Sequence, residues 1–569
     1  MRGSKQLRAL LLPILVLLTM LVAACGSTGG GAPAGNTGTS TKPAPAPADK
    51  QVFRYPEAAI DDFGTLDPAL VQSASDAYVI QTIFTGLVQF KDDGTVVDQL
   101  AASHTVSSDG LTYTFTLRPN LKFSDGSPLT AQDVAWSIDR ALKPATKSQV
   151  INYLNLLKDW DKMTSGKIPT LIGDSIIVKD PSTIQLIISK PAAYFLQALT
   201  YPISYPVQKK LIDQYGEKWT DHLTEGGGCG PFKVASYSHT KGIEVVPNPN
   251  YYGPQPKLQK IQFTFSGDSD TTFKAYLSGQ YDYTGVPSAL YEQYKDHKDF
   301  HRTPALVIGY LTMNYLAKPF DDIKVRQAFA LALNKDLLVK SVLKNAHSPT
   351  NHIVPEGMFG YNKNLTGPLG VTATKGDQEK AKQLLQESSY AGKLPPITLT
   401  YYTGNNTIKN VVTAVVQQWK TVLGVDVKTT AVDFNKLIEI TNGTKGNANV
   451  QMWILGWQAD YVDPQDWLGV FFEPNADDNL NNYGQNNSPM AAQQQAVQAQ
   501  LQKADVTQDQ NERLKLYNDA EQKIVNDVGW IPLYQSAFLT MTNPKLYNYK
   551  DTPLGITAPD DWADIYFTQ

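Results

Sequence analysis

The densest group of residues suited to ligand chemistry lies between Trp453 and Pro464. This stretch reads Trp-Ile-Leu-Gly-Trp-Gln-Ala-Asp-Tyr-Val-Asp-Pro, so two tryptophans, a tyrosine and two carboxylates fall within a dozen residues. An ionised carboxylate beside aromatic walls suits a ligand that carries a positively charged amine. The pattern also fits a core strand that ends in a polar turn, and the spacing alone does not decide between the two.

Motifs for catalysis are scarce. The sequence has no Gly-x-Ser-x-Gly elbow, no Walker loop and no Rossmann glycine fingerprint that opens a helix. Within residues 226–230, Cys229 stands among glycines and could act as a nucleophile near backbone N–H donors. We favour a sharp chain turn, because glycine allows positive φ and Pro231 fixes the exit. The protein is therefore predicted not to be an enzyme.

The histidines and cysteines give little support for a metal centre. His297 and His301 are four residues apart and could share a helix face, but their stretch is charged and is interpreted as solvated surface. The cysteines are Cys25 and Cys229, which excludes a disulfide scaffold and an all-cysteine metal cluster. We predict no metal and no cofactor.

The composition is that of a folded protein with more than one domain. The chain has 569 residues, of which 42% are hydrophobic and 18% charged, so two or three folded units are expected. Lys and Arg number 50 against 54 Asp and Glu, a net charge of -4, which argues against nucleic acid as the main partner.

The N-terminus has the pattern of a secretory signal. A basic start precedes an apolar run from Ala9 to Ala24 that contains Pro13 and is too short to span a membrane. Residues 22–26, Val-Ala-Ala-Cys-Gly, resemble a bacterial lipoprotein box, which implies cleavage after residue 24 and a lipid on Cys25. Ordinary cleavage beside a chance cysteine is the alternative. An acyl anchor would hold an otherwise soluble protein at a membrane surface.

A flexible tether follows the expected cleavage site. Of the 25 residues in 26–50, 21 are Gly, Ala, Ser, Thr or Pro. This segment therefore has too little apolar surface to bury and is not expected to fold. Residues 25–50 are therefore predicted to be the lipidated cysteine and its linker.

The remaining sequence mixes strand and helix patterns. Leu111–Leu117 alternates apolar and threonine side chains, which predicts a half-buried strand, and 175–178 with 183–188 indicates a hairpin. Thr130–Asp133 fits a helix capping box. Ser488–Val525 predicts polar helices with a break near residues 505–507. The fold class is thus α/β, with at least two lobes.

Several segments together resemble the extracellular solute-binding proteins of family 5, the oligopeptide- and dipeptide-binding lipoproteins of ABC importers. The resemblance runs from Phe53 to Gln569. The segments are Thr65–Pro68, Ile83–Val88, Asp109–Arg118, Phe123–Val134, Tyr215–Trp219, Gly228–Phe232, Pro319–Ala328 and Gly456–Pro464. The family usually has threonine where this chain has Cys229, a further argument against a catalytic cysteine.

The resemblance implies a two-lobed clamp of the periplasmic-binding-protein type (type II, three-domain, class C), with a hinge between the lobes. Two crossover strands would connect the lobes, and ligand would bind in the cleft that closes by hinge motion. The implied boundaries are 1–24 for the signal peptide, 25–50 for the lipidated linker, 51–74, 199–306 and 538–569 for lobe I, 75–198 for an inserted small domain, and 307–537 for lobe II.

The resemblance also implies site residues. Asp460 matches the family carboxylate that pairs with a peptide's free amine. The strand edge at Gly456 and Trp457 would bind the peptide backbone, and such binding does not depend on the peptide's side chains. Trp457 and Tyr461 would wall the cleft. Near the N-terminal strand, either Asp62 or Glu57 could be the acidic group that peptide binders often have. Lys445 is a candidate partner for the carboxylate of the ligand, because no arginine lies between residues 326 and 513.

The implied function is a lipid-anchored, extracytoplasmic and monomeric binding protein that captures peptides and delivers them to an ABC permease and ATPase complex. One alternative keeps the fold and binds another solute, such as an oligosaccharide or a nickel complex. Another is a peptide-signal receptor. A secreted hydrolase would rest on Cys229 alone.

Overall fold

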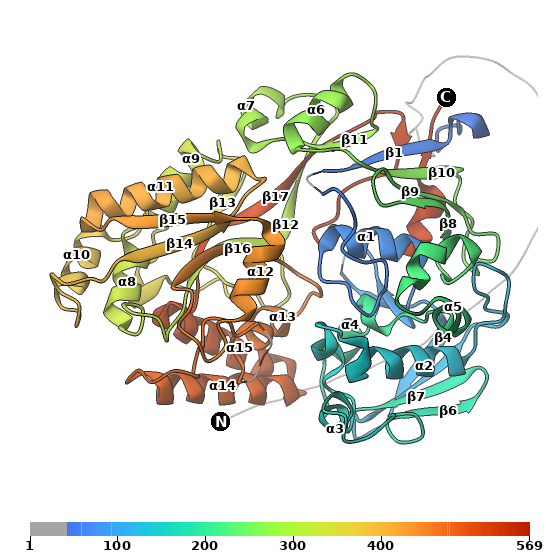
Figure 1. The fold of residues 1–569 in the computed structure, drawn as a ribbon, viewed down its shortest axis with the longest axis horizontal. Coiled ribbons are helices and arrows are strands. Elements are labelled where there is room, and N and C mark those ends of the chain that lie inside the picture. The colour runs from blue at the N-terminus through green and yellow to red at the C-terminus, as the bar shows by residue number, and fades with distance from the viewer. Residues whose placement is uncertain (1–41, 59, 93, 475, 477) are drawn as a thin grey trace, which may run out of the picture. The chain divides into compact units, whose positions relative to one another are not determined.

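The computed structural model describes residues 42–569 apart from 59, 93, 475 and 477 (Figure 1). Residues 44–569 form one unit by their contacts. The predicted signal peptide, Cys25 and most of the tether lie outside the described residues. Along the described part of the chain, no helix combines the length and the apolar character needed to cross a membrane.

A first sheet is built from the N-terminal strand and a later meander. Its strand order is β1-β10-β9-β8, with β1 parallel to β10 and the other neighbours antiparallel. Ile261 and Phe263 of β10 are buried on the same face, as their alternation predicts. The strands are β1 (Val52–Glu57), β8 (Phe232–Ser238), β9 (Gly242–Pro247) and β10 (Lys260–Phe265).

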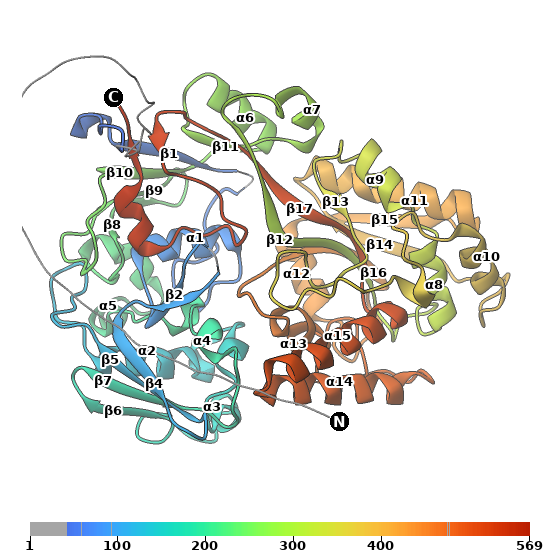
Figure 2. The ribbon, with the colours of Figure 1, turned by 180° about the vertical axis from the view of Figure 1, so that it is seen from behind.

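A second sheet lies within the segment 75–198, with the order β4-β5-β7-β6 (Figure 2). Tyr113 and Phe115 of β5 are buried, so the strand predicted at 111–117 is confirmed, as is the hairpin of β6 and β7. Helix α2 (Ala131–Ala141) begins with the predicted capping box, in which the Asp133 carboxylate accepts the Thr130 N–H at 2.8 Å. The strands are β4 (Ala101–Val106), β5 (Thr112–Leu117), β6 (Ile176–Asp180) and β7 (Thr183–Ile187).

A third sheet carries the long strands of the molecule. Its order is β11-β17-β12-β16-β14-β15, and β13 pairs with β17. Strands β14 and β15 run parallel, as do β14 and β16, while the other neighbours are antiparallel. The strands are β11 (Tyr283–Gly285), β12 (Phe300–Met313), β13 (Ser348–Pro349), β14 (Ile397–Tyr402), β15 (Val427–Val432), β16 (Met452–Gln458) and β17 (Ile531–Thr542).

Strands β12 and β17 pair along most of their length and run through the middle of Figure 1. The boundaries predicted between lobes, 306/307 and 537/538, fall inside these two strands. Their register shifts between Pro304 and Ile308, where the ladder is interrupted. There the Gln535 side chain donates a hydrogen bond to the Ala305 carbonyl at 3.0 Å. The numerical domain boundaries stay a prediction.

Helices and short strands fill the rest of the chain. The polar stretch from Ser488 forms two helices separated after Val506, as predicted. The elements are α1 (Ala74–Ile83), α3 (Trp160–Thr164), α4 (Phe195–Ala198), α5 (Lys209–Tyr215), α6 (Ser269–Leu277), α7 (Tyr291–Tyr294), α8 (Ile323–Leu331), α9 (Lys335–Ser341), α10 (Gln378–Gln386), α11 (Asn406–Leu423), α12 (Phe434–Asn442), α13 (Gln465–Phe472), α14 (Ala491–Val506), α15 (Gln510–Asp527), β2 (Val88–Phe90), β3 (Val96–Asp98), β18 (Leu546–Tyr547) and β19 (Tyr566–Phe567).

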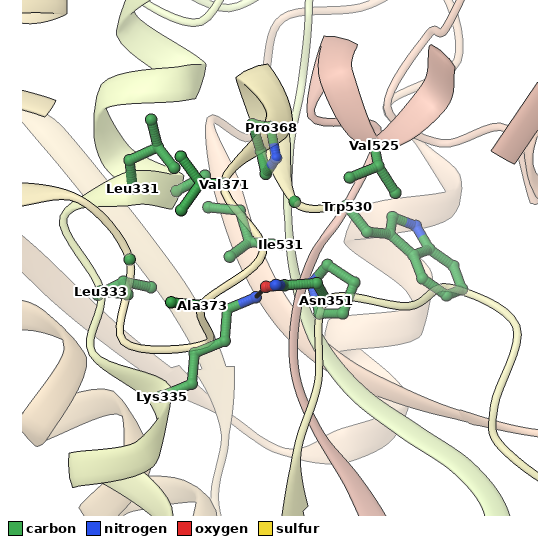
Figure 3. Close-up of a pocket in the computed structure, with 14 residues that line it drawn as sticks. Leu331, Leu333, Lys335, Asn351, Pro368, Val371, Ala373, Val525, Trp530 and Ile531 are labelled. Atoms are coloured by element: carbon green, nitrogen blue, oxygen red, sulfur yellow. Dashed lines mark hydrogen bonds between the residues drawn. The ribbon is translucent and has the colours of Figure 1, made fainter. Parts of the chain in front are cut away.

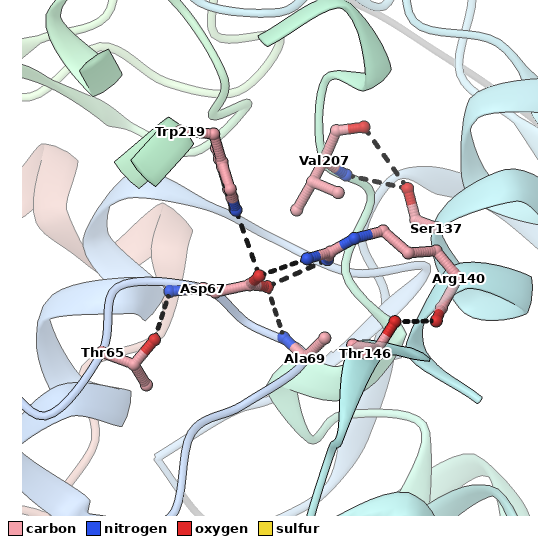
Figure 4. Close-up of polar contacts among 8 residues, drawn as sticks. All are labelled: Thr65, Asp67, Ala69, Ser137, Arg140, Thr146, Val207 and Trp219. Carbon is pink, nitrogen blue, oxygen red and sulfur yellow. Dashed lines mark hydrogen bonds and ion pairs between the residues drawn. The ribbon is translucent and has the colours of Figure 1, made fainter. Parts of the chain in front are cut away.

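A buried carboxylate joins the first sheet's surroundings to α2 (Figure 4). Asp67 is 3% exposed and pairs with the Arg140 guanidinium through contacts of 3.1 and 2.5 Å. It also accepts the Trp219 indole N–H at 3.1 Å and the Ala69 backbone N–H at 3.0 Å. Asp67, from the Thr65–Pro68 segment, is therefore a structural residue that ties three parts of the chain together.

Candidate functional site

Strand β16 leaves one of its edges open where the predicted binding residues begin. On one side, Gly456 and Trp457 pair with Gly309 and Ile308 of β12. On the other side, β16 pairs with β14 at Met452 and Trp453. Among the described residues, no later residue of β16 pairs with β14. The C-terminal half of β16 thus has a strand partner along one edge only.

The backbone of Gly456 is placed for a ligand strand. The Ala459 N–H donates to the Leu306 carbonyl of β12 at 2.8 Å. Backbone groups in an antiparallel ladder alternate in direction, so Trp457 points its N–H and C=O toward β12 and Gly456 points them away. Gly456 is exposed and has no side chain to hinder an approaching chain. This geometry suits the addition of an extended peptide by backbone hydrogen bonds.

Asp460 follows the strand and is half-buried against a residue from far away in the sequence. The Tyr153 hydroxyl donates a hydrogen bond to the Asp460 carboxylate. Burial raises the pKa of Asp460 to about 7, an effect that the Tyr153 hydrogen bond opposes. No cation pairs with Asp460 among the described residues. The carboxylate is therefore suited to a cationic group from outside the chain.

Two further acids fix the turn that presents Asp460. Asp466, which is fully buried, accepts the Asp460 backbone N–H at 3.0 Å. Burial and the Asp460 charge raise the pKa of Asp466 well above its usual range. Asp463 forms a buried ion pair with Arg513 of α15, with contacts of 2.8 and 2.6 Å. Arg513 is thus occupied by Asp463.

The aromatic residues predicted to wall the site have different surroundings. Trp457 is half-buried and its ring meets the edge of Phe471 at a centroid distance of 4.7 Å. Tyr461 is 2% exposed, and its hydroxyl is hydrogen-bonded to Gln465. The Tyr461 ring stacks with Tyr194 at 6.3 Å. Trp457 therefore keeps a partly open face, whereas Tyr461 packs between elements.

Sequence reasoning missed the residues of the segment 75–198 that face the turn. Tyr153 stacks on Tyr201 with ring centroids 3.8 Å apart and an interplanar angle of 4°. Close by, the Tyr194 hydroxyl donates to Asp505 of α14 at 3.4 Å. These tyrosines are some 300 residues from their acidic partners, and no local spacing in the sequence marks them.

The other acidic and basic candidates lie in different settings. Glu57 is 5% exposed, and burial raises its pKa to about 8. Asp62 accepts hydrogen bonds from Tyr237 at 2.7 Å and lies 2.7 Å from His239 Nδ1. Lys445 is exposed in the loop after α12. Their roles toward a ligand stay predictions.

Cys229 is buried and lies in the glycine-rich turn. It is 1% exposed, its Sγ is 3.6 Å from the Thr85 carbonyl oxygen, and burial raises its pKa to about 12. A nucleophilic cysteine needs the opposite shift. Gly227 has a positive φ of 98°, and a Cβ at Gly228 would lie 2.3 Å from the Ile83 carbonyl oxygen. The glycines therefore serve the turn and its close packing.

Cys229→Ser is expected to leave ligand binding unchanged, because the thiolate is strongly disfavoured and the side chain faces the core. Calorimetric titration of both proteins measures this. The melting temperature serves as the control for folding. A variant that folds normally but no longer binds would contradict the structural role.

The two histidines lie on the exposed surface, as their charged stretch predicts. His297 follows α7 and His301 is in β12, so they do not share the helix face that the metal-binding alternative would need. Within the described ranges, no group of three or more His, Cys, Asp or Glu side chains could hold a metal ion.

A small cavity lies away from the turn at Asp460 (Figure 3). It is lined by residues of α8, the start of α9, the loop 351–376 and the start of β17. None of the residues predicted to bind the ligand lines it.

The comparisons with known proteins identify the family. The family model for bacterial extracellular solute-binding proteins, family 5 Middle, matches residues 95–479, which is more than half of the chain. The chain therefore belongs to the bacterial extracellular solute-binding proteins of family 5. The α/β fold is the two-lobed clamp of that family.

Two similar proteins are named for the peptides that they bind. The oligopeptide-binding protein OppA of Bacillus subtilis is 26% identical, with 97% of each chain covered. The murein tripeptide-binding protein MppA of Escherichia coli is 26% identical in a solved structure, with a TM-score of 0.78 and coverage of 93% of this chain and 100% of that chain. These relatives are binding proteins rather than enzymes.

A second MppA structure bears on the conformation. The TM-score to the unliganded open form of MppA is 0.67, with coverage of 93% and 99% and 26% identity, against 0.78 for the first structure. This chain is thus less similar to the open form of MppA than to the first MppA structure. The contacts of Tyr153 with Asp460 and of Tyr194 with Asp505 join the segment 75–198 to residues of the predicted second lobe.

Proposed function

We propose that this protein captures peptides between its lobes and delivers them to the permease of an ABC importer, without catalysing a reaction. The observation that carries the proposal is the Asp460 carboxylate, which has no cationic partner among the described residues and lies directly after the open edge of β16. A peptide offers what this place lacks, namely a free ammonium group and a backbone that can extend a sheet. The peptide-binding relatives support the same ligand class.

The binding mode follows from these groups. The peptide backbone adds to the β16 edge at Gly456, which recognises no particular side chain. The terminal ammonium pairs with Asp460 in place of the Tyr153 hydroxyl, and the Trp457 ring covers the chain. Asp466 and the pair of Asp463 with Arg513 hold the turn in position.

The cellular setting belongs to the same proposal. A lipid on Cys25 anchors the mature chain at the extracytoplasmic face of the membrane, and residues 26–50 let the folded body reach the permease. The chain acts as a monomer in complex with membrane and ATPase subunits. Mass spectrometry of the N-terminal peptide tests the anchor, since an unmodified Cys25 in membrane-extracted protein contradicts it.

The proposal is tested by calorimetric titration of the purified chain with di- to hexapeptides and with their N-acetylated forms. Free peptides are expected to bind, and acetylation is expected to weaken binding because it removes the ammonium charge. Oligosaccharides and nickel serve as the comparison ligands. Binding of these ligands alone would overturn peptide capture but leave the solute-binding fold intact.

Peptide affinity is expected to fall as the pH falls below about 7. Burial raises the pKa of Asp460 to about 7, and only its ionised form attracts an ammonium group. Binding of the amine therefore requires loss of the proton, so the affinity is present above this pH and is lost below it, by at most about tenfold per pH unit. Titrations between pH 5 and 7.5 measure this, since peptide amines themselves lose charge near pH 8. A flat profile would contradict the role of Asp460.

A further inference from the structure

Lys335 is a buried cation in lobe II that the peptide site does not use. It is the first residue of α9, is 5% exposed, and lines the cavity in Figure 3. Lysine is almost never buried to this extent unless a negative group pairs with it. The surroundings of its ammonium group therefore need an explanation.

The hydrogen-bond partners of Lys335 are neutral. Its Nζ donates to the Thr350 carbonyl at 2.9 Å and to the Asn351 Oδ1 at 2.6 Å. Figure 3 shows the bond to Asn351 at the edge of the cavity. An ammonium group has three N–H donors, so these two acceptors leave one donor for a further partner.

Nearby acids do not neutralise this ammonium group. Asp336 is exposed, and its carboxylate accepts a hydrogen bond from the Thr374 hydroxyl. No carboxylate lies within 4.0 Å of Lys335 Nζ in the part of the chain that the structure describes. Burial lowers the pKa of Lys335 to about 7, which Asp336 opposes only in part. Burial thus disfavours the charged form of Lys335, and an anion beside its ammonium group would favour that form.

The cavity has room for one small anion. Its volume of about 20 Å³ is above the roughly 10–15 Å³ that a cavity needs to hold one water molecule, so a single small ion fits. Its walls are mostly apolar, and its polar side chains are Lys335 and Asn351. The apolar lining includes Leu331, Leu333, Val371, Trp530 and Ile531. A water molecule would satisfy the third N–H but would leave the positive charge unbalanced.

We propose that this cavity binds a monovalent anion of the size of chloride against Lys335 Nζ. The anion would neutralise the ammonium group and so stabilise its bonds to Thr350 and Asn351, which join α9 to the following loop. The site is separate from the turn at Asp460, and the inference does not depend on the nature of the transported ligand.

Crystals of the full chain grown in bromide test the site directly, because bromide replaces chloride and scatters anomalously. We expect an anomalous peak at hydrogen-bond distance from Lys335 Nζ. A water molecule or an empty cavity at this place, with bromide found elsewhere in the same crystal, would overturn the proposal.

Thermal melting provides a second test in solution. Replacing gluconate by chloride at constant ionic strength is expected to raise the melting temperature of the native protein by about 2 °C. Lys335→Met is expected to lose this response, whereas the matched variant Lys324→Met, whose lysine is exposed and pairs with Glu387, is expected to keep it. An equal chloride response in Lys335→Met, or no response in the native protein, would overturn the proposal.

Discussion

Asp460→Asn is expected to weaken the binding of free peptides by about a hundredfold or more. The substitution keeps the shape of the side chain but removes its charge, so a buried ammonium group loses its counter-charge. Removing one member of a buried ion pair costs about 3–5 kcal/mol, and about 1.4 kcal/mol corresponds to a tenfold change in affinity. Calorimetric titration of both proteins with the same peptide measures the loss.

Two controls separate this effect from general damage. Asp519→Asn removes an exposed carboxylate that pairs with Lys515 in the same lobe, and it is expected to leave affinity unchanged. N-acetylated peptides should bind the native protein and Asp460→Asn almost equally weakly. An unchanged affinity for free peptides in Asp460→Asn would remove the assignment.

Asp67→Ala is expected to lower the free energy of unfolding by about 3–5 kcal/mol. The substitution leaves the Arg140 guanidinium and the Trp219 indole N–H without their carboxylate partner in a mostly buried place (Figure 4). Unfolding in urea, followed by circular dichroism, measures the change. Asp67 has no contact with the turn at Asp460, so peptide affinity is expected to persist wherever the variant remains folded.

The matched control for this prediction is Asp213→Ala. Asp213 pairs with Lys209 one helical turn away at 2.5 Å, and both side chains are more than half exposed. Exposed pairs of this kind contribute about 0.2–1 kcal/mol. A loss in Asp67→Ala no larger than in this control would show that the buried network is not needed for stability.

Elements with strong local periodicity could be predicted from the sequence alone. The alternation at Leu111–Leu117 predicts β5, because each apolar side chain must reach the same face of one sheet. The break between α14 and α15 was equally predictable, since polar turn residues interrupt the helical pattern. The solvated surface predicted around His297 and His301 is confirmed, because both residues are exposed. Their spacing of four residues does not place them on one helix, since pairing with β17 extends the chain from Phe300 onward.

The candidate site could be predicted only on the side where its residues are contiguous. The residues from Gly456 to Tyr461 are close in sequence, so their chemistry is visible in one short motif. The partner Tyr153 comes from the segment 75–198, some 300 residues earlier, and only the folded chain brings its hydroxyl to the Asp460 carboxylate. Asp466 is near in sequence, but its role in fixing the Asp460 main chain depends on the shape of the turn.

The interrupted ladder between β12 and β17 has a consequence for motion. With the predicted boundaries, both connections between the lobes are the paired strands β12 and β17, so the lobes would share a ribbon rather than two independent linkers. A ribbon is expected to bend most readily where its pairing is irregular, here between Pro304 and Ile308 and again between Gly309 and Tyr310. We therefore expect the predicted lobes to swing along one main path, so that little orientational freedom would be left to lose when they close on a ligand.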